Sequence, residues 1–148
     1  MSAVSRVVIA LAALALVGCG SSSGHPAART VSVRLGDGQV RAEIAADDSA
    51  RTRGLSGRPS LAEGRGMLFV YNGSARRTYW MKGMRFPIDI VWIEAGRVTG
   101  VEGDAPVPAG SRLPLYSSDG PADHVLELRA GWARRHGVER GDPVTIGR

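Results

Sequence analysis

Residues 30–45 of the chain read TVSVRLGDGQVRAEIA, and this stretch decides the class of fold. Apolar and polar residues alternate on both sides of a Gly36-Asp37-Gly38 turn. Alternation with a period of two is typical of a strand with one buried face, and a glycine-rich turn between two such runs predicts a β-hairpin. The alternating apolar residues are Val31, Val33 and Leu35 before the turn, and Val40, Ala42 and Ile44 after it.

Short apolar stretches separated by glycine-containing turns continue along the rest of the chain. This rhythm predicts a mainly β domain, a small antiparallel β-barrel or sandwich with one or two short helices. After the first hairpin we expect a helix over residues 49–55, capped by Asp47 or Asp48 and ended near Gly57 and Pro59. A strand over 67–71 should follow, with a turn at Asn72-Gly73, and then a hairpin of 88–94 with 97–101. The remaining expected elements are a surface loop over 103–118, a strand over 124–129, a helical turn over 132–136 and a closing strand over 143–146.

The first 19 residues have the pattern of a bacterial lipoprotein export signal. Arg6 lies in a short basic start, residues 7–17 are apolar, and Leu16-Val17-Gly18-Cys19 resembles a lipobox. The apolar run is shorter than the ~20 residues that a membrane-spanning helix needs. We therefore expect residues 1–18 to be a signal peptide, Cys19 to carry lipid, and residues 19–29 to tether a single β-rich domain of residues 30–148 to the membrane. The alternative is an ordinary secretory signal followed by an accidental cysteine.

Composition excludes several classes of function. Cys19 is the only cysteine, so the domain has neither a disulfide nor a thiolate metal site. The net charge is +5, and every basic residue except Lys82 and the histidines is Arg. GC-rich coding produces such a bias; the alternative is attraction to anionic lipid head groups or acidic glycans, because Arg binds carboxylate and phosphate with two hydrogen bonds. Nucleic acid is not an expected partner, since no basic tract is interleaved with aromatic residues.

Three segments together resemble the bacterial and archaeal family called domain of unknown function 192. They are Gly54-Leu55-Ser56-Gly57-Arg58 leading through Leu61 to Gly66-Met67-Leu68-Phe69, then Trp80-Met81-Lys82 followed by Pro87-Ile88-Asp89, and finally Pro121-Ala122 through Val125-Leu126-Glu127 and Ala130-Gly131 to Gly141-Asp142. The resemblance implies a small β-rich fold, often with a signal peptide or lipid anchor, and it supplies no catalytic residue.

The chain departs from the pattern of that family at three positions. Ser56 stands where Met is usual, and Gly83 and Met84 stand where Asn and Thr commonly follow the Trp-Met-Lys motif. If the polar side chains at the last two positions contact a ligand in relatives, this protein lacks two of those contacts.

Asp89 is the first candidate for a functional side chain, because it lies between Ile88 and Ile90 in an otherwise apolar strand. A buried charge is costly unless it is paired. One interpretation is structural: an ion pair with Arg53, Lys82 or Arg85, or hydrogen bonds from backbone amides at a turn. The other is a pocket carboxylate with Glu127 as its partner, because two carboxylates about 5 to 10 Å apart serve as acid and base on a glycoside.

Aromatic and basic residues around Trp80 suggest a binding surface. Tyr79, Trp80 and Trp92 either pack in the core or offer a stacking face for a sugar or other flat ring. If Trp80 points outward, its neighbours Lys82 and Arg85 suit an anionic saccharide or a peptide carboxylate. The candidate ligand-binding residues are Arg53, Trp80, Lys82, Asp89 and Glu127.

Methionine and histidine raise the alternative of a copper site. Thioether and imidazole groups suit Cu(I), and Met67, Met81 and Met84 with His124 or His136 are the available donors. Methionine also fills irregular cores, and the histidines have no spacing typical of metal ligands. We therefore expect no metal or other cofactor.

The leading hypothesis from the sequence is a non-enzymatic, lipid-anchored domain of the cell envelope, on the extracytoplasmic side of a membrane. Its partners are the membrane, through lipid on Cys19, and an envelope ligand or protein. The runner-up is a hydrolase of envelope polymers that uses Asp89 and Glu127. A periplasmic copper carrier is the third hypothesis.

Overall fold

The predicted first hairpin is confirmed in the computed structural model, which describes residues 28–147. Strand β1 (Thr30–Leu35) pairs antiparallel with β2 (Gly38–Ala45), with Val33 opposite Val40. Gly36 turns the chain at a φ of 56°, a conformation that glycine adopts without strain. The signal peptide, Cys19 and most of the tether lie outside the described residues.

Helix α1 (Asp48–Arg53) follows the hairpin, as its capping pattern predicts. The side chain of Asp47 accepts a 2.8 Å hydrogen bond from the backbone N–H of Ala50. The helix ends at Gly54, earlier than expected, because the backbone there reverses at a φ of 50°. The chain then crosses over to β3 (Arg65–Trp80), which runs parallel to β2. The prediction of a purely antiparallel sheet is therefore wrong for this one pair of strands.

Strand β3 is much longer than the predicted strand over residues 67–71. It pairs with β6 (Leu115–Arg129) from Gly66 opposite Leu128 to Trp80 opposite Leu115. The predicted turn at Asn72-Gly73 is wrong, because the chain continues in extended form. A shift of register between Val70 and Ala75 accommodates these residues, so they bend the strand without ending it.

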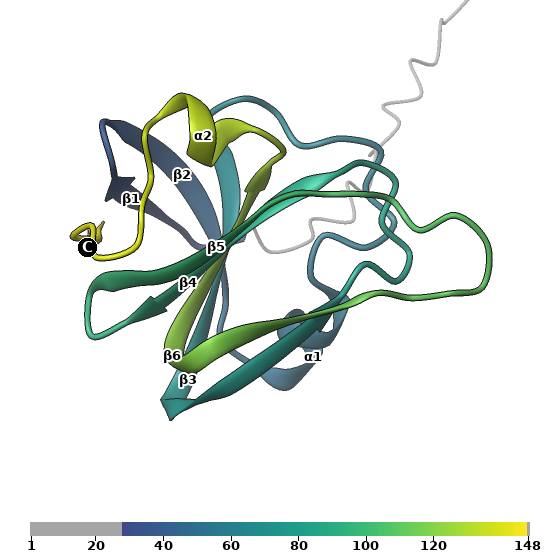
Figure 1. Cartoon of the computed structure of the whole chain (residues 1–148), viewed down its shortest axis with the longest axis horizontal. Coiled ribbons are helices and arrows are strands. Elements are labelled where there is room, and N and C mark those ends of the chain that lie inside the picture. The colour runs from purple at the N-terminus through teal and green to yellow at the C-terminus, as the bar shows by residue number, and fades with distance from the viewer. Residues whose placement is uncertain (1–27, 148) are drawn as a thin grey trace, which may run out of the picture.

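The second hairpin is confirmed, with β4 (Ile88–Glu94) antiparallel to β5 (Arg97–Ala105). Strand β5 extends four residues beyond the predicted end, and β6 begins at Leu115. The expected loop over 103–118 is therefore wrong in extent: only residues 106–114 lie outside strands. Figure 1 shows this loop projecting from one side of the sheet. Helix α2 (Trp132–Arg135) and the short β7 (Thr145–Ile146) agree in position with the predicted C-terminal elements.

The seven strands of the described part of the chain form one curled mixed sheet in the order β5-β4-β6-β3-β2-β1-β7. The two ends of this order meet at one place, where Val98 at the start of β5 exchanges backbone hydrogen bonds of 2.8 and 2.9 Å with Gly141 and Asp142, just before β7. The sheet is therefore a half-open barrel, and the expectation of a mainly β fold with two short helices is confirmed (Figure 1).

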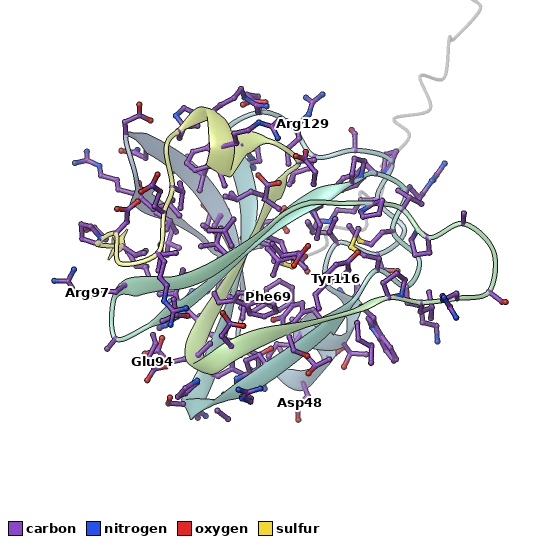
Figure 2. The ribbon with its side chains drawn as sticks, in the orientation of Figure 1. Asp48, Phe69, Glu94, Arg97, Tyr116 and Arg129 are labelled. Atoms are coloured by element: carbon purple, nitrogen blue, oxygen red, sulfur yellow. The ribbon has the colours of Figure 1, made fainter. Side chains whose placement is uncertain are left out.

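Each face of the central strands has its own apolar core, because side chains of a strand alternate between faces. One core contains Leu126, Leu128 and Trp132 of α2. The other contains Phe69, Trp92 and Val125, with Ala50 of α1 packed against it. Figure 2 shows Phe69 in the interior and Arg97 and Arg129 directed outward. Among the described residues, no helix has the length and apolar character to cross a membrane.

Asp89 joins three separate segments at the edge of the first core. The side chain is 1% exposed, and its two oxygens accept hydrogen bonds from the backbone N–H groups of Asp104, Gly131 and Ala133 at 2.8 to 2.9 Å. It thus ties β4 to the end of β5 and to the start of α2. Of the two interpretations of Asp89, the structure agrees with backbone amides as its partners.

We expect Asp89→Asn to lower the free energy of unfolding by roughly 2–5 kcal/mol, because an amide removes the charge and turns an NH2 group toward backbone donors. Urea unfolding at neutral pH measures this loss. The matched control is Asp119→Asn at an exposed ion pair with Arg140, where the change should stay below about 0.5 kcal/mol. Equal unfolding midpoints for Asp89→Asn and the parent would contradict the structural role.

Candidate functional site

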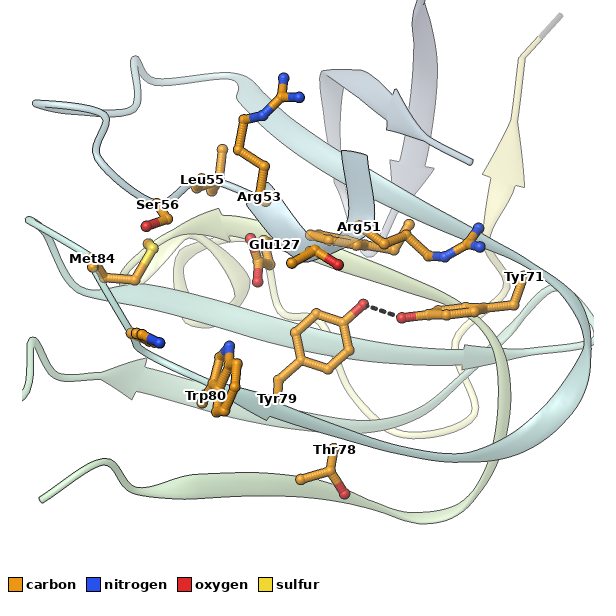
Figure 3. Close-up of a pocket in the computed structure, with 15 residues that line it drawn as sticks. Arg51, Arg53, Leu55, Ser56, Tyr71, Thr78, Tyr79, Trp80, Met84 and Glu127 are labelled. Atoms are coloured by element: carbon orange, nitrogen blue, oxygen red, sulfur yellow. Dashed lines mark hydrogen bonds between the residues drawn. The ribbon is translucent and has the colours of Figure 1, made fainter. Parts of the chain in front are cut away.

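A pocket of about 570 Å³ opens between the end of α1, the second half of β3 and the turn that follows β3. Figure 3 shows Glu127 beside Tyr79, the hydroxyl groups of Tyr71 and Tyr79 meeting, and the guanidinium group of Arg53 directed away from them. The pocket is lined by Arg51, Thr52, Arg53, Gly54, Leu55, Ser56, Phe69, Tyr71, Thr78, Tyr79, Trp80, Lys82, Gly83, Met84 and Glu127.

Glu127 is the acid of this pocket and is only 6% exposed. Its neighbours across the sheet are Met67 on β3 and Ile90 on β4, both apolar and buried. One carboxyl oxygen, Oε2, is buried without a hydrogen-bond partner. Burial raises the pKa of Glu127 to about 8, although the positive charge of Arg58 acts in the opposite direction. At neutral pH the group is therefore mostly a neutral carboxylic acid.

Arg58 does not neutralise Glu127 because it is already paired. Its guanidinium group donates two hydrogen bonds, of 2.7 and 2.6 Å, to the carboxylate of Glu43. This bidentate pair lowers the pKa of Glu43 and raises that of Arg58. Glu43 is therefore ionised and Glu127 is mostly protonated at neutral pH, because only Glu43 accepts hydrogen bonds from Arg58.

Tyr79 forms the wall of the pocket beside Glu127 (Figure 3). Its hydroxyl shares a 2.7 Å hydrogen bond with the hydroxyl of Tyr71, and its ring meets Phe69 and Trp92 edge to face at 5.1 and 5.4 Å. Burial raises the pKa of Tyr79 far above its usual value. These contacts fix the ring, so the wall is rigid and uncharged.

The exposed side of the pocket is aromatic and basic. Trp80 is 54% exposed, and the Lys82 ammonium group lies 5.5 Å from the centre of its ring. Arg53 contributes a further cation, with one hydrogen bond of 3.3 Å to Ser49. Arg51 is held more firmly, by Asp48 and the carbonyl groups of Ala46 and Val70. A ligand therefore meets positive charge and an indole face before it reaches Glu127.

The three departures from the family pattern lie together in this pocket. Ser56, Gly83 and Met84 all line it. The chain at Gly83 has a φ of +70°, and a side chain there would collide with the hydroxyl of Ser56. Ser56 and Gly83 therefore approach each other closely, and a 2.8 Å hydrogen bond from the N–H of Gly57 to the carbonyl of Gly83 joins their two turns at the pocket.

Four of the five candidate ligand-binding residues from the sequence line the pocket: Arg53, Trp80, Lys82 and Glu127. Asp89 does not. It lies opposite Leu128 in the sheet whereas Glu127 lies opposite Ile90, so the two carboxyl groups leave neighbouring strands on opposite faces. The structure does not bring Asp89 and Glu127 together as an acid and base pair.

Sequence reasoning missed Tyr71 and Arg51 as pocket residues. Tyr71 belongs to the same strand as Tyr79, but the bend between Val70 and Ala75 makes their hydroxyl groups meet. Arg51 precedes Arg53 by two residues on α1. The only local signal was the helix itself, whose end lies beside the aromatic block once β3 pairs with β2.

Of the candidate copper donors, the three methionines share the second core, whereas the two histidines lie on the side of the first core. Met67, Met81 and Met84 are buried in the second core, and of these only Met84 lines the pocket. His124 is hydrogen-bonded to Asp123, and His136 to Asp37, both at distances below 3 Å. Within residues 28–147 no cluster of three or more His, Cys, Asp or Glu side chains has a geometry for a metal ion.

Comparison with known proteins places the domain in a family. The family model of DUF192, described as an uncharacterized ACR, matches residues 31–146. The chain belongs to the DUF192 family. The resemblance seen in the sequence is thereby confirmed, and it covers almost all of the described residues. No curated protein matches this DUF192 chain.

Two solved structures resemble this DUF192 domain. A provisionally assigned transcription regulator from Sinorhizobium meliloti has a TM-score of 0.75 and 29% identity, over 83% of this chain and 98% of that one. A protein of unknown function from Novosphingobium aromaticivorans has a TM-score of 0.69 and 29% identity, over 82% and 89% of the two chains. The match covers almost the whole of the crystallised S. meliloti chain.

We expect the stability of this DUF192 domain to fall as the pH rises from about 4.5 to about 8. The unfolded chain loses the Glu127 proton near the ordinary pKa of 4.5, whereas the folded chain keeps it until about 8. Between these values the folded state binds more protons, so the free energy of unfolding falls by up to about 1.4 kcal/mol per pH unit. Urea unfolding of the parent and of Glu127→Gln at pH 5, 7 and 8.5 measures the difference.

The variant Glu127→Gln should lack this component, so it should become more stable than the parent as the pH rises. The control is Glu63→Gln, because Glu63 is an exposed residue in ion pairs with Arg129 and Arg135. Its pH dependence should follow that of the parent. Parallel curves for the parent and Glu127→Gln would show that Glu127 ionises normally in the folded protein.

Proposed function

We propose that this protein is a non-enzymatic, lipid-anchored domain of the cell envelope that binds a small anionic compound containing a ring. The observation that carries the proposal is Glu127, a buried carboxyl group with an unpartnered oxygen in a pocket of about 570 Å³. A buried polar atom without a partner costs free energy in the empty protein. A ligand that supplies the missing hydrogen bond removes this cost.

Charge favours an anion as the ligand. Arg51, Arg53 and Lys82 line the pocket, and among the described residues that line it Glu127 is the only acidic one. Since the pKa of Glu127 is raised to about 8, the acid contributes little negative charge at neutral pH. Because Arg51 is paired with Asp48, Lys82 and Arg53 supply the positive charge of the pocket, and a carboxylate near them forms charge-assisted hydrogen bonds.

The indole of Trp80 favours a ring. A large aromatic side chain that is 54% exposed at the mouth of a pocket offers a flat apolar face. Sugar rings and aromatic rings stack on such a face, and the Tyr79 wall behind it is rigid. Acidic sugars of the envelope combine the ring and the carboxylate, and they agree with the anionic saccharide expected from the sequence.

Binding is favoured over hydrolysis because the pocket offers one carboxyl group. Glycoside hydrolysis by the common mechanisms needs two. The second candidate, Asp89, lies on the opposite face of the sheet and has three backbone partners. Within residues 28–147 no histidine lines the pocket beside Ser56, so these residues offer that hydroxyl no imidazole base.

The assignment of the S. meliloti neighbour as a transcription regulator does not favour nucleic acid as the ligand of this chain. The short helix α2 carries Arg134 and Arg135, and these pair with Asp104 and Glu63. The cations of the pocket lie around one concave site, whereas nucleic acid requires a basic surface along its phosphates. Export to the envelope, which the sequence of residues 1–19 indicates, also separates the protein from DNA.

We expect the folded domain of residues 30–148 to bind N-acetylmuramic acid more tightly than N-acetylglucosamine, which lacks the carboxylate. Trp80→Ala and Lys82→Ala should each weaken binding about tenfold, which corresponds to ~1.4 kcal/mol. Isothermal titration calorimetry at pH 6 measures the affinities. The controls are Arg41→Ala and Val107→Ala, since both residues are exposed and neither lines the pocket. Equal affinity of all five proteins, or for both sugars, would contradict the proposed site.

We expect Cys19→Ala to release the full-length protein from the membrane fraction of expressing bacteria. The reason is that lipid on this residue is the proposed anchor, and no other cysteine is available for acylation. Fractionation followed by detection of the protein measures the change. Ser21→Ala, two residues further along the tether, is the control and should stay with the membranes. Retention of Cys19→Ala in the membrane fraction would contradict lipid anchoring.

A further inference from the structure

The pocket changes in character from its mouth to its floor. Lys82, Arg53 and Trp80 are exposed at the mouth, whereas Glu127 is buried between Met67 and Ile90. An anionic group is stabilised beside the cations at the mouth. At the apolar floor a second charge would be poorly solvated, so the group that reaches Glu127 is expected to be neutral.

A protonated carboxyl group is a hydrogen-bond donor, and an ionised one is only an acceptor. The partner of a neutral Glu127 is therefore an acceptor on the ligand. A carbonyl oxygen fits this requirement, because it accepts hydrogen bonds, carries no charge and has no proton that would compete.

Building on the proposed function, we propose that the ligand of this pocket carries a neutral carbonyl group, such as an acetamido group, that accepts a hydrogen bond from Glu127, and that binding requires the proton on Glu127. The anionic group of the same ligand lies at the mouth, beside Lys82 and Arg53. The ligand class is thus narrowed from anionic ring compounds to those that also bear an acyl group.

The charged and titratable groups around Glu127 are consistent with a retained proton. Helix α1 contributes Arg51 and Arg53, and the segment after it contributes Arg58, which is occupied by Glu43. Strand β3 contributes Tyr79, which is bonded to Tyr71, and the turn after β3 contributes Lys82. Strand β4 presents Ile90, which cannot ionise. None of these cations forms a hydrogen bond or ion pair with Glu127 in the described chain, so burial decides its protonation.

The protonation of Glu127 makes ligand binding depend on pH, and the affinity should fall as the pH rises. Only the protonated form is competent, so the apparent dissociation constant rises in proportion as that form is depleted. With a pKa of about 8, about one tenth of the free protein keeps the proton at pH 9. Glutamine has nearly the same shape and keeps an N–H donor at every pH.

The test compares the parent and Glu127→Gln by isothermal titration calorimetry with N-acetylmuramic acid at pH 6 and pH 9. We expect the affinity of the parent to fall about tenfold at pH 9 and that of Glu127→Gln to stay constant. The variant also controls for every other group that titrates in this range. A second probe, 3-O-carboxyethyl-glucose, keeps the ring and the carboxylate and lacks the acetamido group. It should bind the parent about tenfold more weakly at pH 6, because Glu127 then has no acceptor.

A measurement on the parent alone makes the test independent of the variant. At pH 8.5, titration in two buffers with different heats of ionisation should show uptake of a fraction of a proton for each ligand bound. Absence of uptake overturns the inference, as does equal loss of affinity at pH 9 in the parent and Glu127→Gln. If N-acetylmuramic acid fails to bind the parent even at pH 6, the proposed function itself is contradicted. Binding that is equal at both pH values leaves the proposed function intact and removes only the role of the Glu127 proton.

Discussion

Strands β3 and β6 pair in antiparallel register over most of their 16 and 15 residues, and this interaction positions both the cores and the pocket. On one side β3 also pairs with β2, and on the other β6 also pairs with β4. The register shifts after Val70, and beyond this point the far half of β3 lines one pocket together with the end of α1. The aromatic wall, the Trp80 mouth and the Glu127 floor are all carried by these two strands.

Local sequence patterns predicted the elements of the fold better than their partners. The alternation in residues 30–45 and the capping role of Asp47 were sufficient because both depend on near neighbours. The turn expected at Asn72-Gly73 failed because pairing with β6, more than forty residues away, outweighed the local preference. The parallel pairing of β2 with β3 does have a local signal in the sequence, because a helix between two strands is the usual connection of a parallel pair.

For the candidate site, too, the residues were predicted better than their partners in space. Arg53, Trp80, Lys82 and Glu127 were selected by residue type, and the structure gathers them around one pocket. Whether Asp89 and Glu127 face each other depends on the register of β4 against β6. The register between two strands that are distant in the sequence cannot be predicted from either strand alone. One step of register reverses the face on which a side chain lies. The close approach of Ser56 and Gly83 could not be predicted either, because the two residues meet only when the turns after α1 and β3 pack together.

Asp89 and Glu127 show how a buried carboxyl group that supports the fold differs from one that is available to a ligand. Asp89 has three backbone donors, so its charge is compensated and its removal leaves those donors unpaired. Glu127 has an oxygen without any partner and neighbours that are apolar, so leucine or methionine at this position would be expected to stabilise the domain. The fold gains nothing from the carboxyl group, and the pocket above it holds the cations and the exposed indole. A cost in stability located at such a pocket is the usual mark of a residue kept for binding.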